Sequence, residues 1–220
     1  NYNQNTMGSI IGEIATNAGS TWGPAHEIGH QHQKVFTVNG LTEVTNNMHS
    51  NIAVWYMGLG TSRVNGSEGN LATLYEKNYK MGRHYLFHAH DGGAQNLWTQ
   101  TQMYYKLWMY YHLTGHKTDF FPTLFELNRK DRMSSNNLGW IDGKGHASGT
   151  ASMLKYYKQA CQAAGEDLTE FFRAHGFFFL LNQKERGDCS TSFYTQTQSE
   201  VDAAIAWVKA QGYKENLAPL

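Results

Sequence analysis

The sequence is poor in charged residues, and this scarcity excludes some classes of function. Lysine and arginine together number 18, aspartate and glutamate also number 18, and no block of like charge stands out. Proteins that bind nucleic acid phosphates or anionic membrane surfaces normally carry a basic face. We therefore expect no nucleic-acid partner and no polybasic membrane site.

Cysteines and long apolar runs are also scarce. The two cysteines, Cys161 and Cys189, have no CxxC neighbour, which argues against a structural zinc knuckle and leaves open whether they pair. No apolar run approaches the length of a transmembrane segment. Asn1 opens a polar stretch that is not a signal peptide, so we expect any export signal to lie upstream.

Aromatic and uncharged polar residues are abundant instead. Aromatic residues make up 14% of the chain, with 13 tyrosines and 6 tryptophans. Such side chains suit neutral, hydroxyl-bearing ligands such as sugars, but they also fill helical cores with their polar tips at the edge. For any single aromatic residue, the core is the favoured interpretation.

Apolar periodicity predicts one mainly helical domain over residues 1–220, of the α+β class, with a few strands near the N-terminus. Residues 7–16 favour a strand, and residues 17–24 a turn that ends at Pro24. Residues 177–181 form a short apolar run that fits either a strand or a buried helical turn. The helices are expected near residues 25–35, 41–59, 71–81, 94–113, 120–132, 147–164, 168–175 and 199–211.

The most informative segment is residues 26–30, which read HEIGH and match the HExxH pattern. On a helix His26 and His30 lie on one face, a turn apart, so both imidazoles can bind one zinc ion. A catalytic zinc site keeps one position open for water, and Glu27 directly follows the first ligand, so its carboxylate can activate that water. The segment therefore predicts a zinc-dependent hydrolase.

A second predicted helix supplies the third ligand. Glu43 lies 13 residues after His30, beyond a turn at residues 39–40. Asn47 follows four residues later on the same face, where its amide can orient a ligand imidazole. By chance alone, an HExxH pattern is expected in roughly three chains of this composition per hundred. The alternative interpretation is therefore a surface helix with unrelated histidines. The predicted helix and the positions of Glu43 and Asn47 argue against this alternative.

Other metal arrangements are less favoured. The pattern HExxHxxGxxH fails because positions 33 and 36 are Gln33 and Phe36, and His32 points away from the ligand face. A second histidine-rich stretch contains His84, His88 and His90 but has no adjacent general base. Tyr85, His88 or His90 can instead stabilise the oxyanion of a tetrahedral intermediate, and the sequence does not choose among them.

The residues around the motif resemble a known family. Residues 22–25 (WGPA), HEIGHQHQ and residues 40–47 (GLTEVTNN) are similar to the enhancin-like, mucin-degrading zinc metallopeptidases. These are gluzincins, with the signature HExGH followed by a glutamate, so the resemblance implies His26, His30 and Glu43 as ligands of one zinc ion and Glu27 as the base.

The resemblance further implies a gluzincin-like fold, a secreted or cell-surface bacterial or viral setting, and O-glycosylated, mucin-like proteins as substrates. Family domains carry substantial sequence before the zinc helix, whereas about 25 residues precede His26 here, so we expect a piece of a longer protein with little of the upper lobe. Candidate glycan contacts are Trp22, Trp55, Tyr56 and Arg63. The alternatives are a glycan-independent peptidase or aminopeptidase, and a glycan-binding module with a vestigial zinc site.

Overall fold

The computed structural model describes residues 16–32, 41–59, 97–131, 149–186 and 191–219, together with residues 8, 12–14 and 38. Within these ranges the protein is mainly helical, as the sequence predicts. The helices are α2 (Ala18–His32), α3 (Thr42–Tyr56), α5 (Leu97–Trp108), α6 (Phe120–Lys130), α7 (Gly149–Ala164), α8 (Thr169–Ala174) and α9 (Gln198–Ala210). Helix α5 continues as a π-helical turn, η3 (Met109–Leu113). All of the described helices are too short or too polar to span a bilayer.

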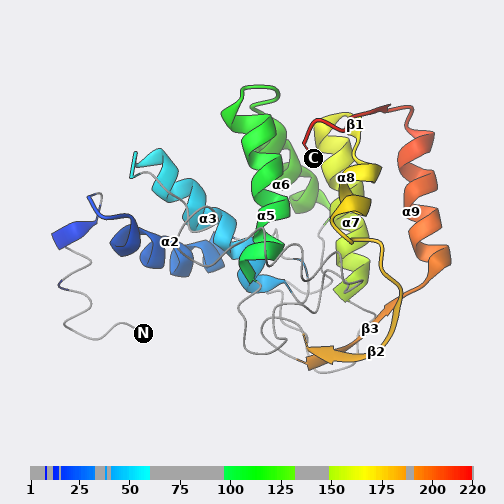
Figure 1. Cartoon of the computed structure of the whole chain (residues 1–220), viewed down its shortest axis with the longest axis horizontal. Coiled ribbons are helices and arrows are strands. Elements are labelled where there is room, and N and C mark those ends of the chain that lie inside the picture. Colours follow the sequence, from blue (N-terminus) through cyan, green and yellow to red (C-terminus); the bar gives the residue numbers. More distant parts are fainter. Residues whose placement is uncertain are drawn as a thin grey trace.

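Most of the helices lie in a row that follows their order in the chain, with α8 overlapping α7 in this view (Figure 1). Helices α2 and α3 pack together at one end of the molecule, α9 lies at the other end, and α5, α6 and α7 lie between them (Figure 1). Helix α3 also packs on α5, so it links the N-terminal pair to the rest of the fold.

The described strands all belong to the C-terminal half, and the described residues at the N-terminal side contain no strand, contrary to the prediction. Strands β2 (Leu181–Arg186) and β3 (Thr191–Gln196) form an antiparallel hairpin. Strand β1 (Glu166–Asp167) pairs in parallel with β4 (Lys214–Glu215). The apolar run at 177–181 contributes only its last residue to a strand, β2.

Residues 7–16 form no strand in their described part, because local hydrogen bonds replace a strand partner. Gly8 and residues 12–13 are helical. The backbone N–H of Thr16 donates to the carbonyl of Glu13 at 2.9 Å, and the Glu13 carboxylate accepts from Asn17 at 3.1 Å and from Ser20 at 2.8 Å.

Helix α2 starts earlier than the sequence suggests, and Pro24 lies inside it. The Asn17 side-chain oxygen accepts from the backbone N–H groups of Gly19 at 2.9 Å and Ser20 at 3.3 Å. Asparagine is a favoured residue at this capping position. The predicted turn over residues 17–24 is therefore wrong, and Pro24 removes one internal hydrogen bond without ending the helix.

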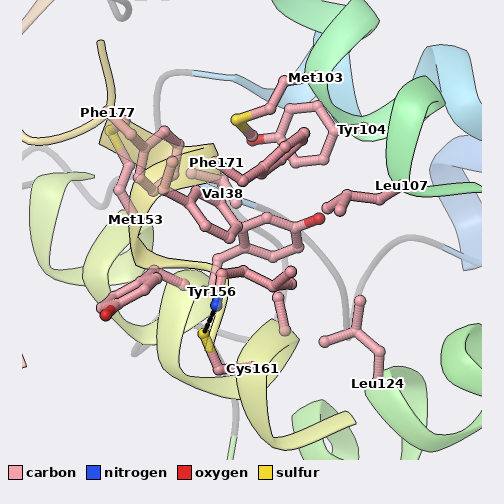
Figure 2. Packing of buried hydrophobic residues seen from close by; sticks show 14 of the residues in the cluster. Val38, Met103, Tyr104, Leu107, Leu124, Met153, Tyr156, Cys161, Phe171 and Phe177 are labelled. Carbon is pink, nitrogen blue, oxygen red and sulfur yellow. Dashed lines mark hydrogen bonds between the residues drawn. The ribbon is translucent and has the colours of Figure 1, made fainter. Parts of the chain in front are cut away.

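Aromatic side chains fill the core between the helices. Tyr104 of α5 contacts Tyr156 of α7 with ring centroids 5.0 Å apart, and Tyr156 contacts Phe172 of α8 at 5.8 Å. Cys161 is a buried free thiol in the same cluster, and its sulfur accepts a hydrogen bond from the backbone N–H of Leu168 (Figure 2). The core interpretation of the aromatic residues is confirmed for the largest fully buried side chains: Trp108, Tyr104, Tyr111, Tyr156, Tyr157, Phe120, Phe171, Phe172 and Phe177.

Candidate metal centre

Helix α2 places His26 and His30 one above the other, since they lie four residues apart. Their ring centroids are 4.7 Å apart and their planes are nearly perpendicular, at 85°. The His26 side chain is 12% exposed and that of His30 is 26% exposed. Both imidazoles are therefore held by the fold and are still reached by solvent.

Gly29, between the two histidines, allows helix α3 to approach α2 closely. A Cβ at this position would overlap the side-chain oxygen of Asn46 and lie 3.0 Å from Cβ of His49. The Asn46 amide donates to the backbone carbonyl of His26 at 2.7 Å, which ties the two helices at the motif. The first turn of α3 consequently lies against the histidines.

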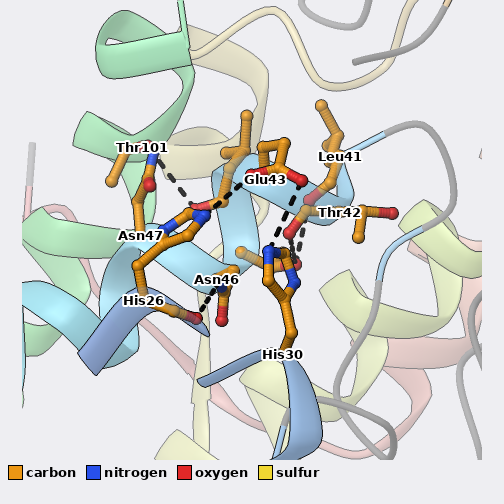
Figure 3. Close-up of polar contacts among 10 residues, drawn as sticks. His26, His30, Leu41, Thr42, Glu43, Asn46, Asn47 and Thr101 are labelled. Carbon is orange, nitrogen blue, oxygen red and sulfur yellow. Dashed lines mark hydrogen bonds and ion pairs between the residues drawn. The ribbon is translucent and has the colours of Figure 1, made fainter. Parts of the chain in front are cut away.

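Glu43 lies in this first turn, and its carboxylate meets both imidazoles (Figure 3). His26 Nε2 is 2.9 Å from one carboxylate oxygen, and His30 Nε2 is 3.5 Å from the other. The Glu43 side chain is 31% exposed. Helices α2 and α3 thus bring three potential ligands to one point at the surface.

These three side chains fit a metal ion. Their ligand atoms all lie within 4.8 Å of one another. Ligand atoms about 2.0–2.1 Å from a tetrahedral ion are about 3.3 Å apart, and the two imidazole–carboxylate distances lie on either side of that value. Two imidazole nitrogens and one carboxylate oxygen form a ligand set that is typical of catalytic metal sites with an open position.

The other polar residues of the motif are exposed. Glu27 directly follows His26 in α2, and its side chain faces solvent. His32 is also exposed and does not belong to the group of three, in line with its prediction as a non-ligand.

His49, one turn after Thr45 in α3, is partly buried next to the centre. Burial, and to a smaller degree the charges of His32 and His30, lower the pKa of His49 to about 4. His49 is therefore neutral near pH 7 and places no positive charge beside the ligands. It lines an apolar cavity of about 300 Å³ between α3 and α6, with Met48, Ile52, Ala53, Phe121 and Phe125.

Asn47 has a different partner from the one predicted. Its amide donates to the Thr101 hydroxyl of α5 at 3.4 Å, and the second ring nitrogen of His26 has no hydrogen-bond partner among the described residues. Successive residues of a helix are rotated by about 100°, so Asn46 faces α2 while Asn47 faces α5. The residue that supports the histidine is thus Asn46, and it does so through the His26 carbonyl.

The predicted glycan contacts lie in two places. Trp22 is beside the centre, but its ring stacks on the His26 imidazole, with centroids 4.9 Å apart and planes at 21°. Trp55 and Tyr56 lie at the other end of α3, about 18 Å along the helix axis from Glu43. The Tyr56 hydroxyl bonds His112 of η3 at 2.6 Å, so this pair packs against η3 and is remote from the ligands.

The remaining predicted site residues lie outside the described residues. These are Arg63, proposed as a glycan contact, and Tyr85, His88 and His90, proposed for the oxyanion. The predicted helix at 71–81 and Cys189 also lie outside them.

Sequence reasoning missed Asn46 and Asn51, both buried in α3. Asn46 follows Glu43 by three residues, so helical spacing places it near the same face. Asn47 follows Glu43 by four residues and also lies near that face, and only the packing of α3 between α2 and α5 decides which amide faces the motif. Asn51 binds the Trp22 indole, a contact for which the sequence holds no signal.

Comparisons with known proteins agree with this geometry. Residues 2–176 match the family described as Peptidase M60, enhancin and enhancin-like. A metallopeptidase from Bacteroides thetaiotaomicron is similar in structure, with 29% identity and a TM-score of 0.74, over 90% of this chain and 31% of that one. A metallopeptidase in complex with Tn antigen is similar at the same identity and TM-score, over 90% of this chain and 34% of that one.

The chain spans about a third of the length of these two structures. No curated protein matches it significantly. The family match covers most of the chain and includes α2, α3 and the three clustered side chains. The chain belongs to the enhancin and enhancin-like metallopeptidases of the M60 family.

Proposed function

We propose that this protein is a zinc-dependent endopeptidase that hydrolyses peptide bonds in O-glycosylated, mucin-like proteins. The observation that carries the proposal is the meeting of one carboxylate, Glu43, with two imidazoles of an HExxH helix. Of the common metal ions, zinc suits two nitrogen ligands and one oxygen ligand best. His26, His30 and Glu43 are the ligands in this proposal.

A zinc ion bound by His26, His30 and Glu43 would supply Lewis-acid chemistry: it would polarise a scissile carbonyl and make a water molecule more acidic. Glu27 is exposed and directly follows His26, so its carboxylate is accessible to such a water. In the proposed reaction a Glu27 carboxylate oxygen takes a proton from the attacking water and later passes it to the leaving amine. His49 is neutral near pH 7, so it adds no positive charge that would compete with a metal ion for Glu43.

The proposal of a glycoprotein substrate is based on the similarity of this chain to a metallopeptidase of known structure. A structure similar to this chain contains Tn antigen, a glycan, in complex with a metallopeptidase. We infer from this relative that a sugar next to the scissile bond is part of the substrate here. A secreted or cell-surface location would agree with such a substrate and belongs to the same proposal.

The mechanism predicts different outcomes for two substitutions. Glu27→Gln removes the base but none of the ligands, so it should keep bound zinc and lower kcat/KM by about 10²–10⁴-fold. His26→Ala should lose both zinc and hydrolysis. Zinc content and cleavage of a defined O-glycopeptide, measured on the same preparations, test this prediction.

A Glu27→Gln protein with full activity would refute the role of Glu27. The glycan requirement is tested separately, with the same peptide before and after enzymatic removal of its sugar. Equal cleavage of the two peptides would exclude a glycan requirement and would indicate a glycan-independent peptidase.

A further inference from the structure

Trp22 and His26 form a stacked pair on α2, one helical turn apart. Their ring centroids are 4.9 Å apart and their planes differ by 21°. The Trp22 indole N–H donates to the side-chain oxygen of Asn51 at 3.1 Å. Asn51 is fully buried in α3, so the indole is held from the helix that also carries Glu43.

The His26 imidazole has few other constraints among the described residues. Its Nε2 faces Glu43, and its Nδ1 is buried without a hydrogen-bond partner there. A metal-binding histidine is usually oriented by a hydrogen bond from its second ring nitrogen to a carboxylate, carbonyl or water. Among the described ring contacts, the His30 imidazole lies nearly perpendicular to the His26 ring and the Trp22 indole lies nearly parallel to it, so the indole is the contact that fixes the plane of the ring.

We propose that Trp22 is a positioning residue for the ligand His26, and that Asn51 holds the Trp22 ring in place. This inference rests on the metal site of the proposed function. The stack limits rotation of the imidazole, so less conformational freedom is lost when a metal binds. The electron-rich indole face also favours the positive charge that an imidazole acquires as a ligand.

Three substitutions distinguish the contribution of the ring stack from that of the indole hydrogen bond. Trp22→Leu removes both, Trp22→Phe keeps an aromatic face without the N–H, and Asn51→Leu keeps the ring without its acceptor. Zinc affinity, measured by competition with a chromogenic chelator, should fall by about 10–100-fold in Trp22→Leu, the range known for residues that orient metal ligands. We expect Trp22→Phe to recover most of this loss and Asn51→Leu to show an intermediate loss.

The visible absorption of the Co²⁺-loaded protein gives a second readout, because it reports ligand geometry independently of activity. It should change in Trp22→Leu and remain close to that of the unsubstituted protein in Trp22→Phe. Trp207→Leu is the matched control, since Trp207 is a partly exposed tryptophan on α9, remote from the centre. If Trp22→Leu does not fold, Trp22→Met takes its place, because methionine adapts to irregular spaces.

The possible results separate this inference from the proposed function. Unchanged zinc affinity in Trp22→Leu, with affinity lost in His26→Ala, overturns the positioning role alone. A loss in Trp22→Leu that Trp22→Phe does not recover overturns the role of the ring stack. If the unsubstituted protein binds no zinc, the proposed function fails, and the positioning role fails with it.

Discussion

His175 is buried between α8 and α5, where both of its ring nitrogens have partners. Nδ1 donates to the Phe171 carbonyl at 2.8 Å, and Lys106 Nζ donates to Nε2 at 3.3 Å. This arrangement requires the neutral imidazole, since a protonated ring has no acceptor for the lysine. Burial is the main cause that lowers the pKa of His175 to about 4, and the Lys106 charge adds to it.

His175 makes stability depend on pH. Between about pH 6.5 and about pH 4 the unfolded chain binds a proton here that the folded protein does not. The free energy of unfolding should therefore fall as the pH falls through this window, by on the order of 3 kcal/mol for this residue. In His175→Gln, whose side-chain oxygen still accepts from Lys106, urea unfolding at several pH values should show a shallower decline.

Lys209→Gln is the control for this experiment, because Lys209 is exposed on α9 and does not contribute to the lowered pKa of His49 or His175. It should keep the pH dependence of the unsubstituted protein. If the free energy of unfolding declines equally with falling pH in His175→Gln and in the unsubstituted protein, His175 is not the source of the pH dependence. His49 is partly buried, and burial also lowers its pKa to about 4, so it adds a second contribution that remains in both variants.

At the scale of elements, the centre depends on the distance between α2 and α3. Two features set this distance: the missing side chain at Gly29 and the bond from Asn46 to the His26 carbonyl. Glu43 lies one turn before Asn46, so a change in the helix separation moves the carboxylate away from both imidazoles.

Gly29→Ala should therefore damage both stability and metal binding. The added methyl group overlaps Asn46, and such overpacking costs about 1–3 kcal/mol of unfolding free energy. Urea unfolding and zinc affinity measure the two effects. Gly12→Ala is the matched control, since Gly12 is helical and a Cβ there meets nothing within 4 Å. Equal zinc affinity in both variants would contradict this role of Gly29.

At the scale of the whole molecule, the centre lies at one end of the fold and the aromatic core extends away from it. Helix α3 joins the two parts, because it packs on α2 with one face and on α5 with another. Metal binding at the end of α3 is thereby coupled to folding of the helical body. A ligand that binds only the folded state raises its stability by mass action.

Zinc should accordingly raise the thermal unfolding temperature of the protein. At a free zinc concentration a hundred times the dissociation constant, the gain is about 2.7 kcal/mol. A chelator should reverse the shift, and Glu43→Ala should abolish it. Glu170→Ala, at a partly exposed carboxylate on α8, should leave the shift intact. An equal shift in Glu43→Ala would mean that the ion binds elsewhere.

Much of the fold could be predicted from the sequence because helices carry their signal locally. The apolar spacing of residues 94–113 predicts one helix where the structure has α5 and η3, without indicating that its end is π-helical, and similar patterns predict α3, α6, α7, α8 and α9. The predicted start of α2 is wrong because Pro24 favours a helix that begins at that proline, whereas the helix begins directly after Asn17, which caps it. The strands were misplaced because short strands depend on partners distant in the chain.

The sequence by itself determined the candidate ligands, since His26 and His30 stand a helical turn apart and Glu43 follows after a break. Only the tertiary structure decided that Asn46 rather than Asn47 supports the motif, and that the Trp22 ring faces His26. These contacts depend on the angle and separation at which α2, α3 and α5 pack. Local periodicity specifies which residues share a helix face, whereas packing between helices specifies what that face meets.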